Sequence, residues 1–259
     1  SGSAYTYSYA SMGELVAWII GWDLILEYSV VCSAVAVGWS QYLNQLLDNL
    51  FGFEIPEALS QAPEQGGVVN LPAVILIILC ALLLIRGASE STTTNAIMVA
   101  IKIGVLIVFI AIGVTGWNSD NLSDFAPFGF SGVTAAAGII FLSFIGLDAV
   151  STAGEEAKDP RRNLPLAILI ALLTVSTLYI LTSLIAVAAQ PAEQFEGQEA
   201  GLAQILENIT GSEWPGTLIA AGAVISIFSV TLVVLYGPTR ILFPMPPAAI
   251  IPTLFHPPN

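Results

Sequence analysis

The stretch "GIIFLSFIGLDAVSTAGEEAKDPRRNLP", from Gly138 to Pro165, begins like a membrane helix and ends like a water-facing loop. Gly146 and Asp148 lie in its middle, where a lipid-facing helix favours Leu or Val. A glycine lowers helix stability by about 1 kcal/mol relative to alanine. Unwound backbone at membrane depth is tolerated only where it lines a cavity, where its free carbonyl and N–H groups bind ammonium and carboxylate groups. "FIGLD" therefore predicts an opening in an apolar helix; the plainer interpretation is a glycine at a helix–helix contact.

The composition of the chain is that of a membrane protein. Of its 259 residues, 56% are hydrophobic and only 10% are charged, whereas soluble domains average about 25% charged residues. A water-soluble core of this size cannot bury so many apolar side chains. We therefore expect an all-α integral membrane fold.

Six apolar runs have the length of about 20 residues that a bilayer crossing requires. They cover residues 14–40, 69–86, 95–116, 132–154, 164–189 and 216–243. The loops after the first and fifth runs are polar, acidic and rich in Gly and Pro. The Pro-rich tail, residues 244–259, is not expected to continue the last helix.

Charge and residue types exclude several classes of function. The net charge is −13, whereas a nucleic-acid-binding surface needs clustered cations, so nucleic acid is not expected as a partner. A single histidine, His256, cannot build a histidine-based metal or haem site, and we expect neither a metal nor a cofactor. An intramembrane aspartyl protease would carry "GxGD" where this chain has "GLD", so an enzyme is not expected. No repeated filter-like segment suggests a channel.

The basic residues give an orientation in the membrane. Five of them fall on one side if the six runs alternate in direction: Arg86, Lys158, Arg161, Arg162 and Arg240. The opposite side holds acidic residues without any Lys or Arg: Asp48, Glu54, Glu57, Glu64, Asp120, Asp124, Glu193, Glu196, Glu199, Glu207 and Glu213. The positive-inside rule assigns the basic side to the cytoplasm, so both ends of the chain are expected there.

Four ionisable residues stand out in the interior of the apolar runs, away from their ends: Asp23, Glu27, Lys102 and Asp148. Each costs about 2.5–3.5 kcal/mol on insertion scales, which marks it as a candidate functional residue. Asp23 and Glu27 are four residues apart and share one helix face. Asp23 is either solvated at the interface or buried, whereas Glu27 is deeper and is expected to be protonated or paired with a cation.

Lys102 lies about a third of the way across its run, in "NAIMVAIKIGVLIVFIAIG". In one interpretation its long stem lets the ammonium reach the cytoplasmic interface. In the other, the ammonium sits in a protein-lined cavity, where burial weakens its preference for the charged form and lets its proton come and go. The residues alone do not decide between the two.

Three stretches carry a resemblance to a known family: "SGSAYTYSYASMGELVAWIIGWDLILEY", "FIGLDAVSTAGEEAKDPRRNLP" and "GPTRILF". They are similar to the amino acid–polyamine–organocation transporters, and most similar to the cationic amino acid transporter branch. The resemblance covers residues 1–243, which we take as a partial transmembrane amino acid permease domain.

The resemblance implies a five-plus-five inverted-repeat bundle that transports amino acids across the plasma membrane by alternating access, coupled to protons. In the family register the six runs are spans three to eight, and residues 132–154 are the broken sixth span. The chain then lacks the first span and half of the substrate site. We expect it to be a fragment that does not transport alone; the alternative is a truncated or accessory membrane subunit.

The resemblance also assigns a substrate site. Phe144, Ile145 and Gly146 would present backbone groups to the substrate ammonium. The aromatic lid of the family falls at Leu142, where neighbouring Phe141 is a possible substitute. Val31 would line the side-chain pocket. A cationic substrate would pair with Glu27 or Asp148, and a neutral one would fit the lining of Val31 and Ile145; the oligomeric state is not predicted.

Two further sets of residues follow from the same register. Lys102 matches a lysine that takes the place of a sodium ion in proton-coupled relatives. Ser226 or Ser229 would be its neighbour. Glu27 is a further candidate for proton coupling. In the loop "EEAKDPRRN", Glu155, Glu156 and Arg161 would form ion pairs that close the inner gate.

Overall fold

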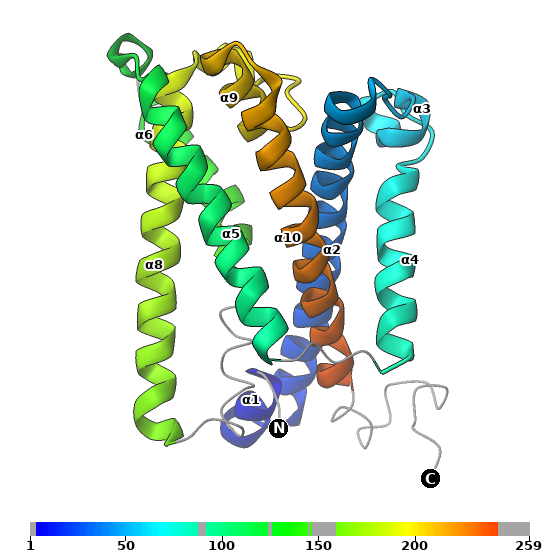
Figure 1. The fold of residues 1–259 in the computed structure, drawn as a ribbon. Helices are drawn as coiled ribbons and strands as arrows, with labels where there is room; N and C mark the ends of the chain where they lie inside the picture. Colours follow the sequence, from blue (N-terminus) through cyan, green and yellow to red (C-terminus); the bar gives the residue numbers. More distant parts are fainter. Residues whose placement is uncertain (1–3, 88–91, 124–125, 145, 147–158, 243–259) are drawn as a thin grey trace. The chain divides into compact units, whose positions relative to one another are not determined.

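A computed structural model of the chain describes residues 4–87, 92–123, 126–144, 146 and 159–242 (Figure 1). These residues form helices and turns without a β-strand among them, which confirms the expected all-α fold. The α-helices are α1 (Ala4–Met12), α2 (Glu14–Phe51), α3 (Glu57–Ser60), α4 (Leu71–Ile85), α5 (Thr92–Gly113), α6 (Gly129–Ile140), α8 (Pro160–Ala189), α9 (Gly201–Thr210) and α10 (Glu213–Leu242). Short 3₁₀ helices are η1 (Pro63–Gln65), η2 (Val114–Gly116), η3 (Ser119–Leu122), η4 (Phe141–Phe144) and η6 (Ala192–Phe195).

The chain divides into two compact units. The first comprises Ser1–Cys32, Gly138–Thr174 and Val233–Asn259, and the second comprises Ser33–Ala137 and Val175–Leu232. Helices α2, α6, α8 and α10 each contribute residues to both units.

The second unit has the larger apolar core, centred on Phe109 of α5, which is fully buried. The core draws on α5, α8, α9 and α10, and its buried members are Phe109, Ile185, Ala186, Ala200, Ala203, Ile205, Leu206, Ile219 and Ala220. Glycines let these helices approach closely: a Cβ on Gly113 would lie 2.5 Å from Ile185 Cγ2, and one on Gly116 would lie 2.5 Å from Ile209 Cγ1. Small residues serve this purpose where helices pack inside a membrane.

The core of the first unit is smaller. Its buried residues are Tyr5, Ala17, Leu24 and Tyr28, and Trp18, Ile20, Ile25 and Val234 pack against them. Tyr28 lies against α10 at Gly237, where a Cβ would come 2.6 Å from Tyr28 Cε1. The absence of a side chain at Gly237 therefore makes room for the tyrosine ring.

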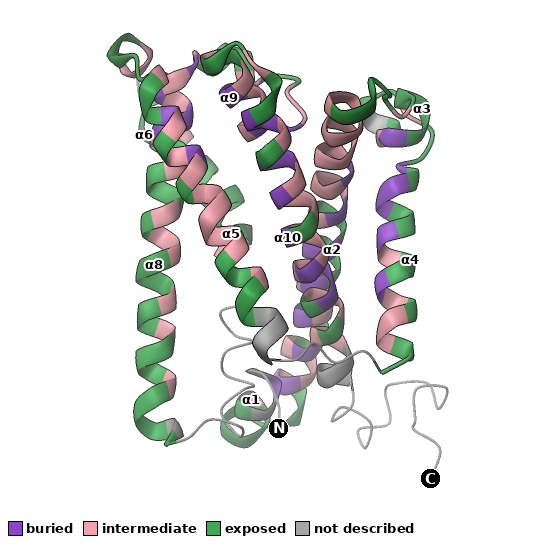
Figure 2. Ribbon diagram, viewed as in Figure 1, coloured by how far each residue is buried: buried purple, intermediate pink, exposed green. Residues whose placement is uncertain are grey.

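Within the described residues, four helical segments are long and apolar enough to cross a membrane: Glu14–Phe51, Ala96–Gly116, Arg161–Ala189 and Glu213–Pro238. Their outer surfaces carry many exposed Leu, Ile and Val side chains. Helix α8 is exposed along most of its length (Figure 2), and its exposed side chains include Leu169, Ile170, Leu173 and Ile180. Apolar surface of this extent is expected where a helix faces lipid.

Helix α2 is longer than its predicted apolar run. It continues to Phe51 rather than ending near residue 40, because residues 41–51 contain neither Gly nor Pro. It ends where Gly52 adopts a φ of +61° and its N–H donates to the Asp48 carbonyl at 2.7 Å. A glycine in this left-handed conformation is a common helix stop.

Two of the six predicted spans are shorter helices. Helix α4 has 15 residues, about 22 Å at 1.5 Å per residue, against a hydrocarbon core of about 30 Å. Asn70 caps its start and Gly87, with a φ of +78°, follows its end. Helix α6 has 12 residues and gives way to η4 at Phe141. The predicted span over 132–154 is therefore interrupted within its described part, as expected of a broken span, and residues 147–154 lie outside the described part.

Candidate functional site

The segment from Phe141 to Gly146 is the predicted opening, and the described residues there leave the α-helical conformation. Helix α6 ends at Ile140, η4 covers Phe141–Phe144, and Gly146 has a φ of +109°. An α-helix requires a negative φ, and only glycine adopts a φ this positive without strain. The helix therefore opens before the glycine, as the sequence predicted.

Three of the predicted substrate-binding residues on this segment are described. The side chain of Phe141 is 70% exposed, whereas Phe144 and Gly146 are half-buried. Ile145 and the side chain of Leu142 lie outside the described part of the chain, as does Asp148. The role of Phe141 as a lid stays a prediction.

The predicted pocket residue of the first unit on α2 is buried. Val31 is 8% exposed, and Glu27, one turn earlier on the same helix, is half-buried. Asp23, a further turn back, is exposed. The burial thus increases along the face from Asp23 to Val31.

The predicted coupling residues of the second unit lie on α5 and α10. The two helices meet at Gly222, where a Cβ would overlap the side chain of Val105. The end of α5 lies beside α9, and α9 leads into α10, so α5 and α10 run in opposite directions (Figure 1).

The contact between Val105 and Gly222 places Lys102 and Ser226 at about the same height along the two antiparallel helices. Lys102 precedes Val105 by three residues and Ser226 follows Gly222 by four, so both lie one turn from the contact in the same direction. Ser229 lies on the same face of α10, one turn further. Because a helical side chain leans toward the N-terminus of its helix, the Lys102 side chain extends toward the level of Ser229.

Burial distinguishes these three residues. Lys102 is half-buried, whereas Ser226 is 8% and Ser229 1% exposed. Within the described residues the Ser226 Oγ is buried without a hydrogen-bond partner. Two residues before Ser226, the Val224 carbonyl accepts a hydrogen bond from the Trp39 indole at 3.0 Å, which links α2 to α10.

The predicted inner-gate ion pairs involve residues that are largely outside the described part of the chain. Arg161 lies exposed in the first turn of α8. Glu155 and Glu156 belong to the undescribed residues 147–158, so the ion pairs stay a prediction.

A polar junction of α2, α9 and α10 was not among the sequence predictions. Glu207 of α9 accepts hydrogen bonds from Asn49 Nδ2 at 2.7 Å and from Gln45 Nε2 at 3.5 Å. Asn49 Nδ2 also donates to Thr217 Oγ1 on α10 at 3.1 Å. At Gly216 a methyl group would overlap the Glu207 carboxyl, so the missing side chain lets that carboxyl reach α10. We call these residues, Gln45, Asn49, Glu207, Gly216 and Thr217, the α2–α9–α10 junction.

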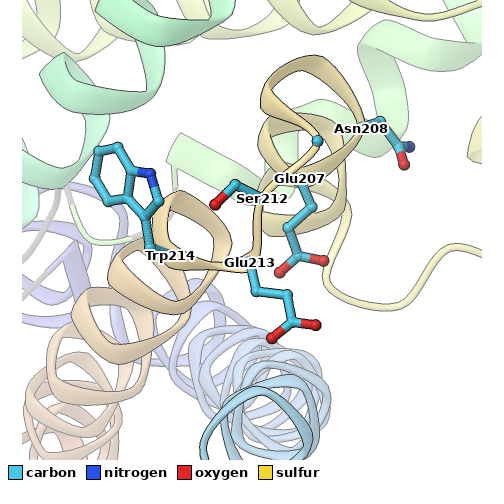
Figure 3. Close-up of a pocket in the computed structure, with 6 residues that line it drawn as sticks. Glu207, Asn208, Ser212, Glu213 and Trp214 are labelled. Atoms are coloured by element: carbon cyan, nitrogen blue, oxygen red, sulfur yellow. The ribbon is translucent and has the colours of Figure 1, made fainter.

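A cavity of about 510 Å³ adjoins this junction and is lined by Glu207, Asn208, Gly211, Ser212, Glu213 and Trp214. Figure 3 shows the Glu207 and Glu213 side chains extending to the same side, with Trp214 directed away from them. Burial raises the pKa of Glu207, the Asn49 hydrogen bond lowers it, and the nearby Glu213 and Asp48 carboxylates raise it further.

The profile described as amino acid permease matches the whole chain, residues 1–259. The chain belongs to the amino acid permease family. This membership and the apolar helices make it part of a multi-pass membrane protein, and they confirm the resemblance inferred from the sequence motifs.

The relatives of this chain are named for different substrates. The branched-chain amino acid permease BcaP of Bacillus subtilis (strain 168) is 43% identical over 258 residues, covering 97% of this chain and 55% of that protein. The methylthioribose transporter of the same organism is 41% identical over 258 residues, covering 98% and 55%. The vacuolar cationic amino acid transporter 4 of Arabidopsis thaliana is 33% identical over 261 residues, covering 98% and 43%. The chain spans about half the length of these relatives.

Family membership does not assign a role to the α2–α9–α10 junction. The sequence placed Glu207 among the acidic residues of a polar loop, where a solvated carboxylate is the ordinary expectation. The available signal was the pair Gln45 and Asn49, two amides on one face of α2 beyond its predicted end. Their partner is more than 150 residues away, so local pattern could not identify it.

Proposed function

We propose that the protein to which this chain contributes is a secondary active transporter of amino acids that works by alternating access. The observation that carries the proposal is the match of the amino acid permease family to residues 1–259. Because the chain spans about half the length of its relatives, the proposal concerns a protein of their length. The chain alone is proposed to be inactive in transport.

The substrate ammonium is proposed to bind backbone groups of Phe144, Ile145 and Gly146. The end of α6 at Ile140 and the φ of +109° at Gly146 support this, because backbone outside a regular helix offers carbonyl groups to a ligand. Phe141 is proposed to act as a lid over the substrate in place of Leu142. Val31 is proposed as part of the side-chain pocket.

The substrate side chain is proposed to be neutral and aliphatic. The burial of the apolar Val31 supports this, as does the name of the branched-chain amino acid permease at 43% identity. A cationic substrate is the competing possibility, supported by the half-buried Glu27 and by the name of the cationic relative. The two differ in charge, so one uptake panel separates them.

Proton coupling is proposed to involve Lys102, with Ser226 and Ser229 as hydrogen-bonding neighbours and Glu27 as a second protonatable group. The common level of Lys102 and Ser226 beside the Val105–Gly222 contact supports this proposal. The buried Oγ of Ser226, which lacks a partner among the described residues, supplies an acceptor suited to an ammonium group.

The charged residues of the loops support two further proposals, one on membrane orientation and one on the inner gate. The basic side is proposed to face the cytoplasm of a cell bounded by the plasma membrane, with both ends of the chain on that side. Arg161 is proposed to pair with Glu155 and Glu156 when the inner gate closes.

An accessory membrane subunit without transport activity is the second candidate. Uptake by a preparation that contains only this chain would exclude it and would also contradict the proposal that the chain alone is inactive.

The test is uptake of labelled leucine, alanine and arginine into proteoliposomes that hold this chain within a protein of family length. We expect leucine uptake to exceed arginine uptake and to increase when the outside is acidified. Lys102→Ala should abolish the increase, whereas Ser33→Ala, at an exposed position of α2, should preserve it. Equal responses of the wild type and Lys102→Ala would refute coupling through Lys102, and no uptake of any amino acid would refute the transporter.

A further inference from the structure

The α2–α9–α10 junction depends on one carboxyl group. Glu207 Oε1 accepts from Asn49 at 2.7 Å, and Asn49 in turn donates to Thr217 at 3.1 Å. Gln45 bonds to Asn49 at 3.0 Å and accepts from Gln204 of α9 at 3.4 Å. The side chain of Glu207 is thus the point at which the polar groups of the three helices converge.

Among the residues that the structure describes, no cation acts on this carboxylate. Residues 14–51 and 190–239, which include the parts of α2, α9 and α10 at the junction, contain no Lys or Arg. The charged groups that act on Glu207 are Asp48 from α2 and Glu213 from α10, both acidic. When Glu207 is ionised, only hydrogen bonds from neutral amides therefore stabilise its charge, whereas desolvation and repulsion from Asp48 and Glu213 destabilise it.

We propose that Glu207 is a proton-binding site whose protonation fastens α9 to α2 and α10 and whose ionisation loosens α9. This site is separate from Lys102 and acts on the junction whether or not a substrate is present. The proton would come from the aqueous phase, since the adjoining cavity opens beside Glu207 and Glu213.

The direction of the effect follows from proton linkage. Burial and the two neighbouring carboxylates raise the pKa of Glu207 in the closed junction, whereas a Glu207 released into water returns to its ordinary value. The closed junction therefore binds the proton more tightly than the open one. The stability that protonation adds to the closed junction is fully present when the pH is below the ordinary pKa of glutamate. It is lost as the pH rises through the raised pKa of Glu207 in the closed junction.

Hydrogen–deuterium exchange of α9 in lipid nanodiscs tests the proposal, with rates corrected for the intrinsic pH dependence of exchange. Between about pH 5 and about pH 8, we expect wild-type α9 to lose protection several-fold. Glu207→Gln is uncharged at both values and should keep its protection at the higher pH. Glu193→Gln, a change at an exposed carboxylate in η6, should respond like the wild type.

Infrared difference spectra give a direct reading of protonation that does not depend on the strength of the junction. A protonated-carboxyl band should appear on acidification at a pH above the ordinary range for glutamate, and Glu207→Gln should remove that band. A pH-independent protection of wild-type α9, or a band of undiminished intensity in Glu207→Gln, would overturn the proposal.

A variant that leaves Glu207 in place covers the case in which Glu207→Gln does not fold. In Gly216→Ala the new methyl group must displace the Glu207 carboxyl, which is the far end of a flexible side chain. We expect it to fold and to lose the pH response of α9. Gly38→Ala, where a Cβ meets nothing within 4 Å, should keep the response; a full response in Gly216→Ala would count against the proposal.

Discussion

Asn70 shows at the scale of one residue how a polar side chain organises the start of a helix. It is 9% exposed, its Oδ1 accepts from the Ala73 N–H at 3.1 Å, and its Nδ2 donates to Ser40 Oγ at 2.7 Å and to the Ser60 carbonyl at 2.6 Å. The cap can be inferred from "NLP" in the sequence. The bond to Ser40 cannot, since it depends on how α2 packs beside the turn.

Replacing Asn70 with alanine should lower the free energy of unfolding by about 1–3 kcal/mol, because Ser40 and the Ser60 carbonyl would be left buried with fewer partners. The measurement is thermal or denaturant unfolding in detergent. Asn208→Ala, at an exposed position of α9, is the matched control. Equal stabilities of the two variants would show that the Asn70 contacts contribute nothing.

The end of α6 is the feature at the scale of an element that the sequence predicted best. A glycine within an apolar run led to the expectation of an opening, and the helix does end before Gly146. The lengths of α2 and α4 were predicted less well, because apolar composition does not reveal a cap at Asn70 or a left-handed stop at Gly52. Helix boundaries depend on such local hydrogen bonds more than on hydropathy.

Gly146→Ala should reduce amino acid uptake strongly, because alanine at a φ of +109° is strained by about 1–2 kcal/mol and would favour a different backbone. Gly138→Ala, within α6 and with nothing within 4 Å of a new Cβ, should transport normally. Uptake is measured for both in the proteoliposome assay. Normal uptake by Gly146→Ala would mean that its backbone conformation is not needed.

Gly222→Ala should destabilise the contact between α5 and α10, since the added methyl group meets the branched Val105 side chain rather than a flexible end. Overpacking of this kind costs about 1–3 kcal/mol. Gly104→Ala on α5 faces open space and serves as the control. If both variants unfold at the same temperature, Gly222 does not set the approach of the two helices.

At the scale of the whole molecule, composition and three motifs were sufficient to predict an all-helical membrane protein and its family. They did not predict that the candidate substrate-binding residues and the candidate coupling residues Lys102, Ser226 and Ser229 fall in different units. The substrate candidates Val31, Phe144 and Gly146 belong to the first unit, and Lys102, Ser226 and Ser229 to the second. The α2–α9–α10 junction was not predicted, because its contacts between Asn49 and both Glu207 and Thr217 join residues that are distant in the sequence.

The most direct test of the central claim measures proton entry caused by an amino acid. A pH-sensitive dye would be trapped inside proteoliposomes that hold this chain within a protein of family length, and leucine would be added outside without an imposed pH gradient. We predict acidification of the interior by the wild type and none by Lys102→Ala. An unchanged interior pH in the wild type, under conditions where leucine enters, would contradict proton-coupled transport.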